Sequence, residues 1–427
     1  MSYEGSLFGI NVDCNSASDE IIRSELSFGF HETPGSLKAL AISSAGRYLI
    51  CGGMDEYIRV FDLEKKCSLG EMSGHTGCVT ALGFVGEKFV ISGSEDGTMI
   101  IWKVHGWQKL HILGGHKGPV NDFALHPSGK LCVSVSKDNT LKIWNLVHGR
   151  CAFTRRLKGP AQNVAWHQEK DYYLLIVGNE VQIYNSTGNN ECTGKVTLSS
   201  RVNKACFVDI GAAESAPGVQ QGEIYVAIIS DDCNLQFVTE MGVQIGAQHD
   251  LSRSLGGSRP RDLSCCSLGD LSGLEDEQMK EYMDGEGDAV VVVSSSGAIS
   301  VFSVRRLCEG DEGGEEEDDD EEERGSAEKD LLAHARLANF SIPSEPRITA
   351  VAAYCPVGKK HTDRSSKGEH KDLELVTEGD VAEEASEDGG AEEKKSKKQK
   401  KKRKSSENSP REDVSVKKDK PRKNKTI

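Results

Sequence analysis

Long apolar runs and paired cysteines are both missing from this sequence of 427 residues. No stretch of about 18 apolar residues occurs, and no apolar segment stands near the N-terminus, so neither a membrane span nor a secretory signal is predicted. The thirteen cysteines are odd in number and contain no C-x-x-C pair, which argues against a zinc site and a disulfide framework. We therefore expect a soluble, intracellular protein with free thiols, no bound metal and no membrane contact.

Sequence motifs of common enzymes are missing as well. The chain contains no phosphate-binding loop of the G-x-x-x-x-G-K-[ST] type, no metal-ligand cluster and no single isolated catalytic triad. We therefore expect no enzymatic activity and no cofactor.

What the sequence does contain is a segment of about thirty residues that occurs twice. The first copy, from residue 74, reads "GHTGCVTALGFVGEKFVISGSEDGTMIIWK", and the second, from residue 115, reads "GHKGPVNDFALHPSGKLCVSVSKDNTLKIWN". His75 and His116 are 41 residues apart, and Trp102 and Trp144 are 42 apart. A weaker copy, "LKALAISSAGRYLICGGMDEYIRVFD", precedes them in phase. This period is typical of WD-type propeller blades, each built from four short antiparallel strands.

Each strong copy contains a histidine, a serine, an aspartate and a tryptophan, which resemble the hydrogen-bonded set of WD-family blades. The predicted sets are His75, Ser92, Asp96 and Trp102 in one copy and His116, Ser134, Asp138 and Trp144 in the other. Hydrolases also combine His, Ser and Asp, but catalysis needs one triad in one cleft, whereas these sets recur once per copy. We interpret them as structural, because a buried imidazole needs a partner for each ring nitrogen.

The fold class that follows is all-β: a seven-bladed WD-repeat β-propeller over residues 1–356 and a disordered charged C-terminal tail over 357–427. Weaker copies continue beyond the two strong ones, and are interrupted by an expected loop over 253–287 and a disordered acidic insert over about 309–324. The stretch 347–354 resembles the first strand of a blade, but no further strands of that blade follow it in the sequence. The N-terminal strands, in turn, are not preceded by a first strand. We expect the two to pair and complete blade seven, because a closed ring leaves no open sheet edge.

The net charge of −15 is strongly segregated along the chain. Residues 309–323 carry twelve acids and no base, 369–393 carry eleven acids and one lysine, and 394–427 carry sixteen Lys and Arg against four acids. Such blocks repel themselves and bury little apolar surface, so we expect them to be disordered. For the acidic blocks two interpretations stay open: they shield basic partner proteins, or they only solvate the chain.

The densest basic run is "KKSKKQKKKRK". Its charged members are Lys394, Lys395, Lys397, Lys398, Lys400, Lys401, Lys402, Arg403 and Lys404. A run of this density is typical of a nuclear or nucleolar import signal or of an RNA-binding arm, and a solubility tail is the alternative. No aromatic residue lies among the lysines, so RNA binding through them is expected to be non-specific and salt-dependent.

Two consecutive segments, "HKGPVNDFALHPSGKLCVSVSKDNTLKIWNLVHGRCAF" and "NVAWHQEKDYYLLIVGNEVQIY", resemble the p21-activated-kinase-interacting proteins, a WD-repeat family of the nucleolus. The resemblance implies a non-enzymatic adaptor in biogenesis of the large ribosomal subunit. Its expected partners are pre-ribosomal proteins and ribosomal RNA, with the chain a monomer within a large assembly in the nucleus and nucleolus. It equally implies an alternative, in which the protein binds and inhibits p21-activated kinase. The acidic run over 309–323 and the loop over 253–288 exceed the family pattern.

Overall fold

The computed structural model describes residues 1–14, 22–31, 35–187, 190–210, 223–267, 288–309, 336–341 and 348–352. All of them belong to the first of two compact units, Met1–Val381. The basic run over 394–404, the tail over 357–427 and most of the acidic insert, from residue 310 onward, lie outside the described residues. Those predictions are therefore left as they stand.

Six antiparallel sheets of four strands follow one another in chain order, and we number them as blades one to six. Blade one contains β3 (Leu37–Ile42), β4 (Tyr48–Gly53), β5 (Ile58–Asp62) and β6 (Cys67–Met72). Blade two contains β7 (Val79–Val85), β8 (Phe89–Ser94), β9 (Thr98–Lys103) and β10 (Gln108–Gly114). Blade three contains β11 (Val120–Leu125), β12 (Leu131–Ser136), β13 (Thr140–Asn145) and β14 (Arg150–Arg156).

The remaining three sheets come from the weaker copies. Blade four contains β15 (Asn163–Trp166), β16 (Tyr172–Val177), β17 (Glu180–Asn185) and β18 (Cys192–Thr197). Blade five contains β19 (Val202–Val208), β20 (Tyr225–Ser230), β21 (Asn234–Thr239) and β22 (Gln244–Asp250). Blade six contains β23 (Pro260–Ser267), β24 (Asp288–Ser294), β25 (Ala298–Ser303) and β26 (Arg336–Ser341), with the short helix α2 (Val304–Glu309) after β25.

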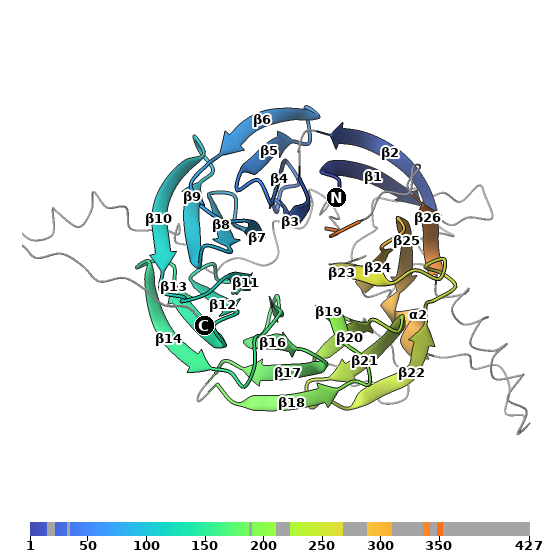
Figure 1. Cartoon of the computed structure of the whole chain (residues 1–427). Coiled ribbons are helices and arrows are strands. Elements are labelled where there is room, and N and C mark those ends of the chain that lie inside the picture. The colour runs from blue at the N-terminus through green and yellow to red at the C-terminus, as the bar shows by residue number, and fades with distance from the viewer. Residues whose placement is uncertain are drawn as a thin grey trace, which may run out of the picture. The chain divides into compact units, whose positions relative to one another are not determined.

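The sheets are arranged around a central axis, with the first strand of each blade nearest the axis and the fourth at the rim (Figure 1). The predicted fold class, an all-β propeller, is confirmed. The inner strands are buried over most of their length, and their apolar side chains pack between neighbouring sheets: one cluster joins Ile58 and Val60 of blade one to Val79, Val90 and Ile100 of blade two. Each such buried side chain contributes about 1.5–3 kcal/mol to folding. Within the described part of the chain, no helix has the length and apolar character needed to cross a membrane.

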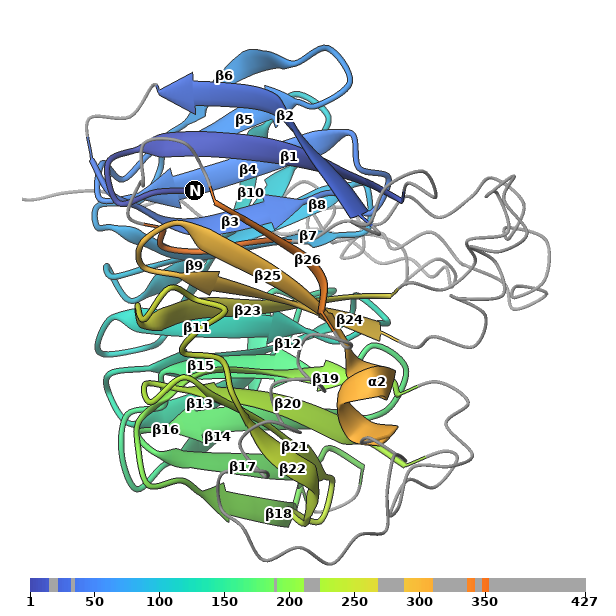
Figure 2. The ribbon, with the colours of Figure 1, turned by 90° about the vertical axis from the view of Figure 1, so that its right-hand side faces the viewer.

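Blade six differs from the sequence-based expectation. The segment 253–287 was expected to be a loop, yet it contains the complete first strand β23, and the fourth strand β26 follows the acidic insert. The strand is hard to recognise because Asp262, a carboxylate, occupies a buried position in it. In Figure 2, α2 lies at one end of the blade, beside β24 and β26.

The N-terminal residues form a two-stranded sheet of β1 (Ser6–Cys14) and β2 (Ile22–His31). Ser2 forms an antiparallel bridge with Ile348, and the Thr349 amide donates a hydrogen bond to the Met1 carbonyl at 3.1 Å. The segment 348–352 also contacts blade six, because the Val351 amide donates to Asp262 Oδ2 at 2.8 Å. The two ends of the expected seventh blade are thus in contact.

Side chains at bulges join consecutive blades near the axis. In five of the six first strands the pairing register shifts at one extra residue, which is Thr80 in blade two and Asn121 in blade three. Thr80 Oγ1 donates to the carbonyl of Val120 at 2.7 Å, and Asn121 Nδ2 donates to that of Ala161 at 2.6 Å. Asn203 of blade five donates in the same way to the Pro260 carbonyl, at 2.8 Å. The bulge therefore re-aims one side chain per blade toward the next blade.

Candidate functional site

The first predicted set forms one connected network in blade two. His75 lies in the loop before β7, and its Nδ1 is 3.0 Å from Asp96 Oδ2 while its Nε2 is 2.7 Å from Ser92 Oγ. Trp102 Nε1 donates to the same Ser92 Oγ at 2.8 Å. The ionised Asp96 only accepts, so the imidazole carries a proton on Nδ1 and donates it to Asp96. In the neutral ring Nε2 then accepts the hydrogen of Ser92, whose oxygen accepts from Trp102.

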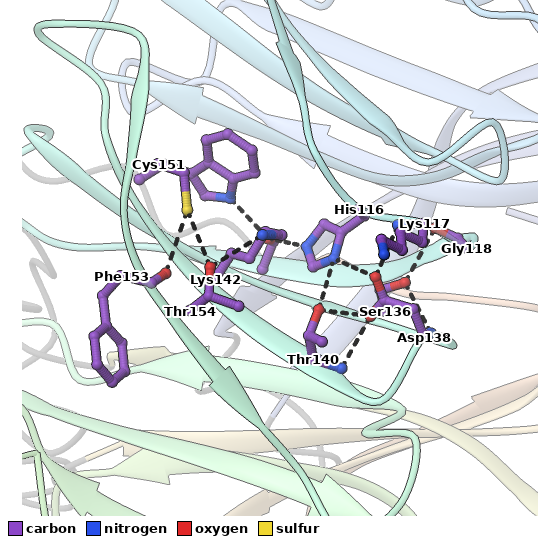
Figure 3. Close-up of polar contacts among 12 residues, drawn as sticks. His116, Lys117, Gly118, Ser136, Asp138, Thr140, Lys142, Cys151, Phe153 and Thr154 are labelled. Atoms are coloured by element: carbon purple, nitrogen blue, oxygen red, sulfur yellow. Dashed lines mark hydrogen bonds and ion pairs between the residues drawn. The ribbon is translucent and has the colours of Figure 1, made fainter.

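The second set repeats this geometry in blade three (Figure 3). His116 Nδ1 is 3.2 Å from Asp138 Oδ2, its Nε2 is 2.7 Å from Ser134 Oγ, and Trp144 Nε1 donates to Ser134 at 2.8 Å. The structure thus brings together all eight predicted blade-set residues, four in each blade. The network connects the loop that enters a blade to its second and third strands.

Each aspartate also caps the turn in which it lies. Asp138 Oδ1 accepts from the Thr140 amide at 2.9 Å and from the Thr140 hydroxyl at 2.6 Å, while its Oδ2 accepts from the Lys117 amide at 2.8 Å. Burial acts to raise the pKa of Asp138, but these hydrogen bonds outweigh it and hold the pKa at about 2. Thr76 and Thr98 likewise outweigh burial and lower the pKa of Asp96. Both carboxylates are therefore ionised across the physiological pH range.

Burial decides the charge of the two histidines. Removal from water lowers the pKa of His75 and of His116, although the adjacent aspartates oppose the shift. The rings are thus neutral at pH 7, each with its one proton on the Nδ1 that faces the aspartate. Ser92 and Ser134 are completely buried and each already donates its hydrogen, so neither hydroxyl is placed to attack a substrate. The geometry fixes loops and does not form an exposed nucleophile.

Four further residues belong to these networks, and the sequence analysis did not include them: Ser94 and Thr98 in blade two, and Ser136 and Thr140 in blade three. Ser94 Oγ donates to the Gly77 carbonyl at 2.9 Å, and Ser136 Oγ donates to the Gly118 carbonyl at 3.0 Å. Each joins the entry loop of a blade to the turn after its second strand. Ser94 and Ser136 are 42 residues apart, as are the two threonines that cap the turns. The same repeat spacing that located the eight residues was therefore sufficient to find these four.

Blades one and four stabilise their turns by other means. In blade one, Arg59 is buried, forms an ion pair with Asp55 in the preceding turn and reaches Glu71 with its Nε at 3.1 Å. In blade four, Asn179 lies in the corresponding turn and its Nδ2 donates to the Leu198 carbonyl at 2.8 Å. The weaker copies have thus replaced the histidine network by an ion pair or by an asparagine hydrogen bond.

Three charged residues of different blades interact near the axis. Asp122 Oδ2 accepts from Asn163 Nδ2 and from the Val164 amide, both at 3.2 Å, and Asp262 accepts from Val351. Burial raises the pKa of both aspartates, and Lys204 opposes that rise. Burial also acts to lower the pKa of Lys204, but Asp262 and Asp122 outweigh it and raise the pKa. We call Asp122, Lys204 and Asp262 the axial trio.

The described residues also include potential metal ligands and cysteines. Among the described residues, no group of three or more His, Cys, Asp or Glu side chains is placed to hold a metal ion. Eleven cysteines of the described ranges form no disulfide bond. The nine basic residues from Lys394 to Lys404 lie outside the described ranges, so their predicted role stays a prediction.

Comparison with known proteins places the repeats in a family of motifs. The model of the "WD domain, G-beta repeat" matches residues 24–62, 66–103 and 107–145. These three repeats cover blades one and two, most of blade three and part of the N-terminal hairpin.

Curated relatives share the same region. A "p21-activated protein kinase-interacting protein 1-like" from Gallus gallus is 38% identical over 181 residues, which is 42% of this chain and 48% of the relative. One of the same name from Danio rerio is 34% identical over 206 residues, 48% of this chain and 54% of the relative. "Protein MAK11" from Saccharomyces cerevisiae is 33% identical over 177 residues, 37% and 42% of the two chains. The chain spans about half the length of the curated relatives it matches.

Proposed function

We propose that this WD40-repeat propeller, homologous to proteins named for interacting with p21-activated kinase, is a non-enzymatic scaffold in nucleolar biogenesis of the large ribosomal subunit. The observation that carries the scaffold role is the double His–Ser–Asp–Trp network. Its reactive groups are buried and used to fix loops, which leaves the loop surfaces as the part of the blades available to partners. The resemblance to WD-repeat proteins of the nucleolus supports the ribosomal setting.

The basic run supports the proposed location and one class of partner. Nine Lys and Arg residues within 394–404 would serve nuclear and nucleolar import. The same charges would attract ribosomal RNA by releasing counterions from its phosphates. Pre-ribosomal proteins would bind the propeller loops, with the chain as a single copy in a larger particle.

Depletion of the protein tests this proposal. The expected result is a lower level of mature large subunits together with accumulation of their precursor RNA. Purification of the full chain under mild salt should recover pre-ribosomal proteins. Unchanged ribosome profiles after complete depletion would contradict the ribosomal role.

The names of the relatives favour a second candidate, negative regulation of p21-activated kinase by direct binding. In this case the loop surfaces would hold the regulatory part of the kinase. Depletion should then raise kinase output while ribosome profiles stay normal. Direct binding of the purified chain to the kinase, with inhibition of its activity, is the matching measurement in vitro.

A further inference from the structure

Consecutive antiparallel strands place two kinds of connection on one face of the propeller. The loop that enters a blade and the turn between its second and third strands lie at the same end, since the chain reverses direction at every strand. Hydrogen bonds between them show this directly in blade three. The Lys137 amide donates to the Pro119 carbonyl at 2.9 Å, and the Leu157 amide, at the start of the next entry loop, donates to the Asn139 carbonyl at 2.8 Å. We call this end the entry face.

Four exposed cations follow one another on the entry face over blades three to five. Lys117 lies in the entry loop of blade three, Lys137 in its turn, Lys158 in the entry loop of blade four and Arg201 in that of blade five. We call these four residues the basic arc. Their blades are neighbours around the axis, since β11 contacts β15 and β15 contacts β19.

Over blades three and four the basic arc has almost no opposing charge. At its blade-five end the turn 231–233 contains Asp231 and Asp232, and the Asp231 amide donates to the Arg201 carbonyl at 2.9 Å. The other connections that carry the arc are 115–119, 137–139, 157–162, 178–179 and 198–201, and Asp138 is the one acid they contain. That carboxylate is already bound by His116, Thr140 and the Lys117 amide. Among the described residues, none of the four cations forms an ion pair.

The same face has the opposite character over blades one and two. There the corresponding turns contain Asp55 and Glu56 in blade one and Glu95 in blade two. The one nearby lysine, Lys38, is paired with Glu95 at 3.1 Å. The positive charge of the entry face is thus concentrated on one side of the ring.

The composition of the arc favours a nucleic acid over an acidic protein as its ligand. Protein interfaces derive most of their affinity from buried aromatic and arginine anchors, but no large apolar side chain is exposed in the five connections of the arc. Binding to phosphates needs no such anchor, because release of counterions supplies the free energy. Three of the four cations are lysines, which act as point charges and read no base.

We propose that the basic arc binds the phosphate backbone of RNA, as a contact separate from the basic run at the C-terminus. This goes beyond the proposed function, which assigns RNA binding to the tail alone. It rests on the charges of the entry face, and its test does not depend on whether the protein has a ribosomal role.

The test compares two full-length variants with equal loss of charge. The arc variant carries Lys117→Gln, Lys137→Gln, Lys158→Gln and Arg201→Gln. The control variant carries Lys65→Gln, Lys66→Gln, Lys88→Gln and Lys130→Gln, all exposed and all in connections at the opposite end of the blades. Binding to single-stranded polyuridylate is measured by fluorescence anisotropy between about 50 and 200 mM salt.

The salt dependence of binding gives the expected result. Each lost phosphate contact lowers the slope of log K against log salt by about 0.7, so the arc variant should lower it by up to about 2.8. The control variant should lower it by less than about 0.7, because no contact is lost. Equal slopes for the two variants would overturn the proposal.

Two further measurements keep the result interpretable. Melting temperatures identify a misfolded variant. If the arc variant melts at a lower temperature than the wild type, Lys137→Gln and Lys158→Gln are tested singly, and each should reduce the salt slope by about 0.7.

Binding to polyglutamate distinguishes RNA from an acidic protein as the ligand. If the arc variant loses polyglutamate binding and keeps its RNA salt slope, the ligand is an acidic protein and the RNA proposal is wrong.

Discussion

The indole nitrogen of Trp144 donates to the hydroxyl of Ser134 at 2.8 Å, and the same hydroxyl is 2.7 Å from Nε2 of His116. Trp144 lies on the third strand of the blade, Ser134 on the second and His116 in the entry loop. The network thus runs from the sheet to the loop, and the carboxylate at its end, Asp138, fixes its direction because it only accepts.

Replacing this tryptophan tests the network and the packing together. Trp144 is 2% exposed, so Trp144→Ala should lower the free energy of unfolding by about 3–5 kcal/mol. Trp144→Phe keeps an aromatic ring but leaves Ser134 without its donor, and should lower the free energy of unfolding by less than the alanine variant does. Chemical denaturation gives both values. Melting of the alanine variant at the wild-type temperature would show that the blade assignment is wrong.

The neutral histidines predict a pH dependence of stability. Burial lowers the pKa of His116, whereas in the unfolded chain the imidazole titrates near its usual value of about 6.5. The unfolded state therefore takes up a proton first as the pH falls, so the stabilisation is complete above pH about 6.5 and is lost progressively below it.

His116→Gln should flatten the stability profile between pH about 5 and 7. The charged groups facing the ring, Asp138 and Lys142, are unchanged in this variant. His148→Gln, at an exposed position of the same blade, is the matched control. Denaturation series at several pH values measure both, and an unchanged slope for His116→Gln would contradict the assigned neutral state.

The axial trio predicts a stabilising role for one lysine. Lys204→Met removes the cation that interacts with Asp122 and with the buried Asp262, and should cost up to about 3 kcal/mol because the acids are left uncompensated. Lys195→Met breaks an exposed pair with Glu180 and should cost less than about 1 kcal/mol. Equal stability loss in the two variants would show that the trio contributes no more than a surface pair.

Closure of the ring predicts that the N-terminal strands are essential for stability. Deletion of residues 1–30 removes β1, most of β2 and the Ser2–Ile348 bridge, and should be as damaging as deletion of a blade. Exposed sheet edges should also promote aggregation. Thermal melting and sedimentation measure the two effects; a truncated chain that stays monomeric and equally stable would disprove closure by these strands.

The tail predicts that localisation and stability are separable. Removing residues 394–427 takes away sixteen Lys and Arg against four acids but no described strand, so the melting temperature should hardly change. Nucleolar accumulation should fall, because the proposed import signal is gone. Fluorescence microscopy and calorimetry on the same variant give both readouts. Full nucleolar retention would assign localisation to the propeller.

The networks of blades two and three could be predicted because their residues recur within a local repeat. Their members are separated by fixed numbers of residues, so periodicity alone identifies them. The sequence also identified the fold class, and it indicated most strands of the weaker copies. Asp55 keeps the aspartate of the repeat, 41 residues before Asp96, but Arg59 was not recognised as its partner because no arginine stands at the corresponding position of the strong copies.

The axial trio and blade six were not predictable in this way. Asp122, Lys204 and Asp262 interact because a ring brings the first strands of separate blades to one axis, and no spacing within a single repeat encodes that proximity. Asp262 also made β23 hard to recognise in the sequence, since a charged residue interrupts the alternation by which strands are identified.

The bulge donors give the propeller a direction. Thr80 and Asn121 each bond to a carbonyl 40 residues further along the chain, and Asn203 to one 57 residues further, always in the blade that follows. As the polypeptide emerges during synthesis, every one of these acceptors meets a donor that has already been made. Each blade is therefore completed by the blade made next, so the ring can grow in chain order and its final joint waits for residues 348–352.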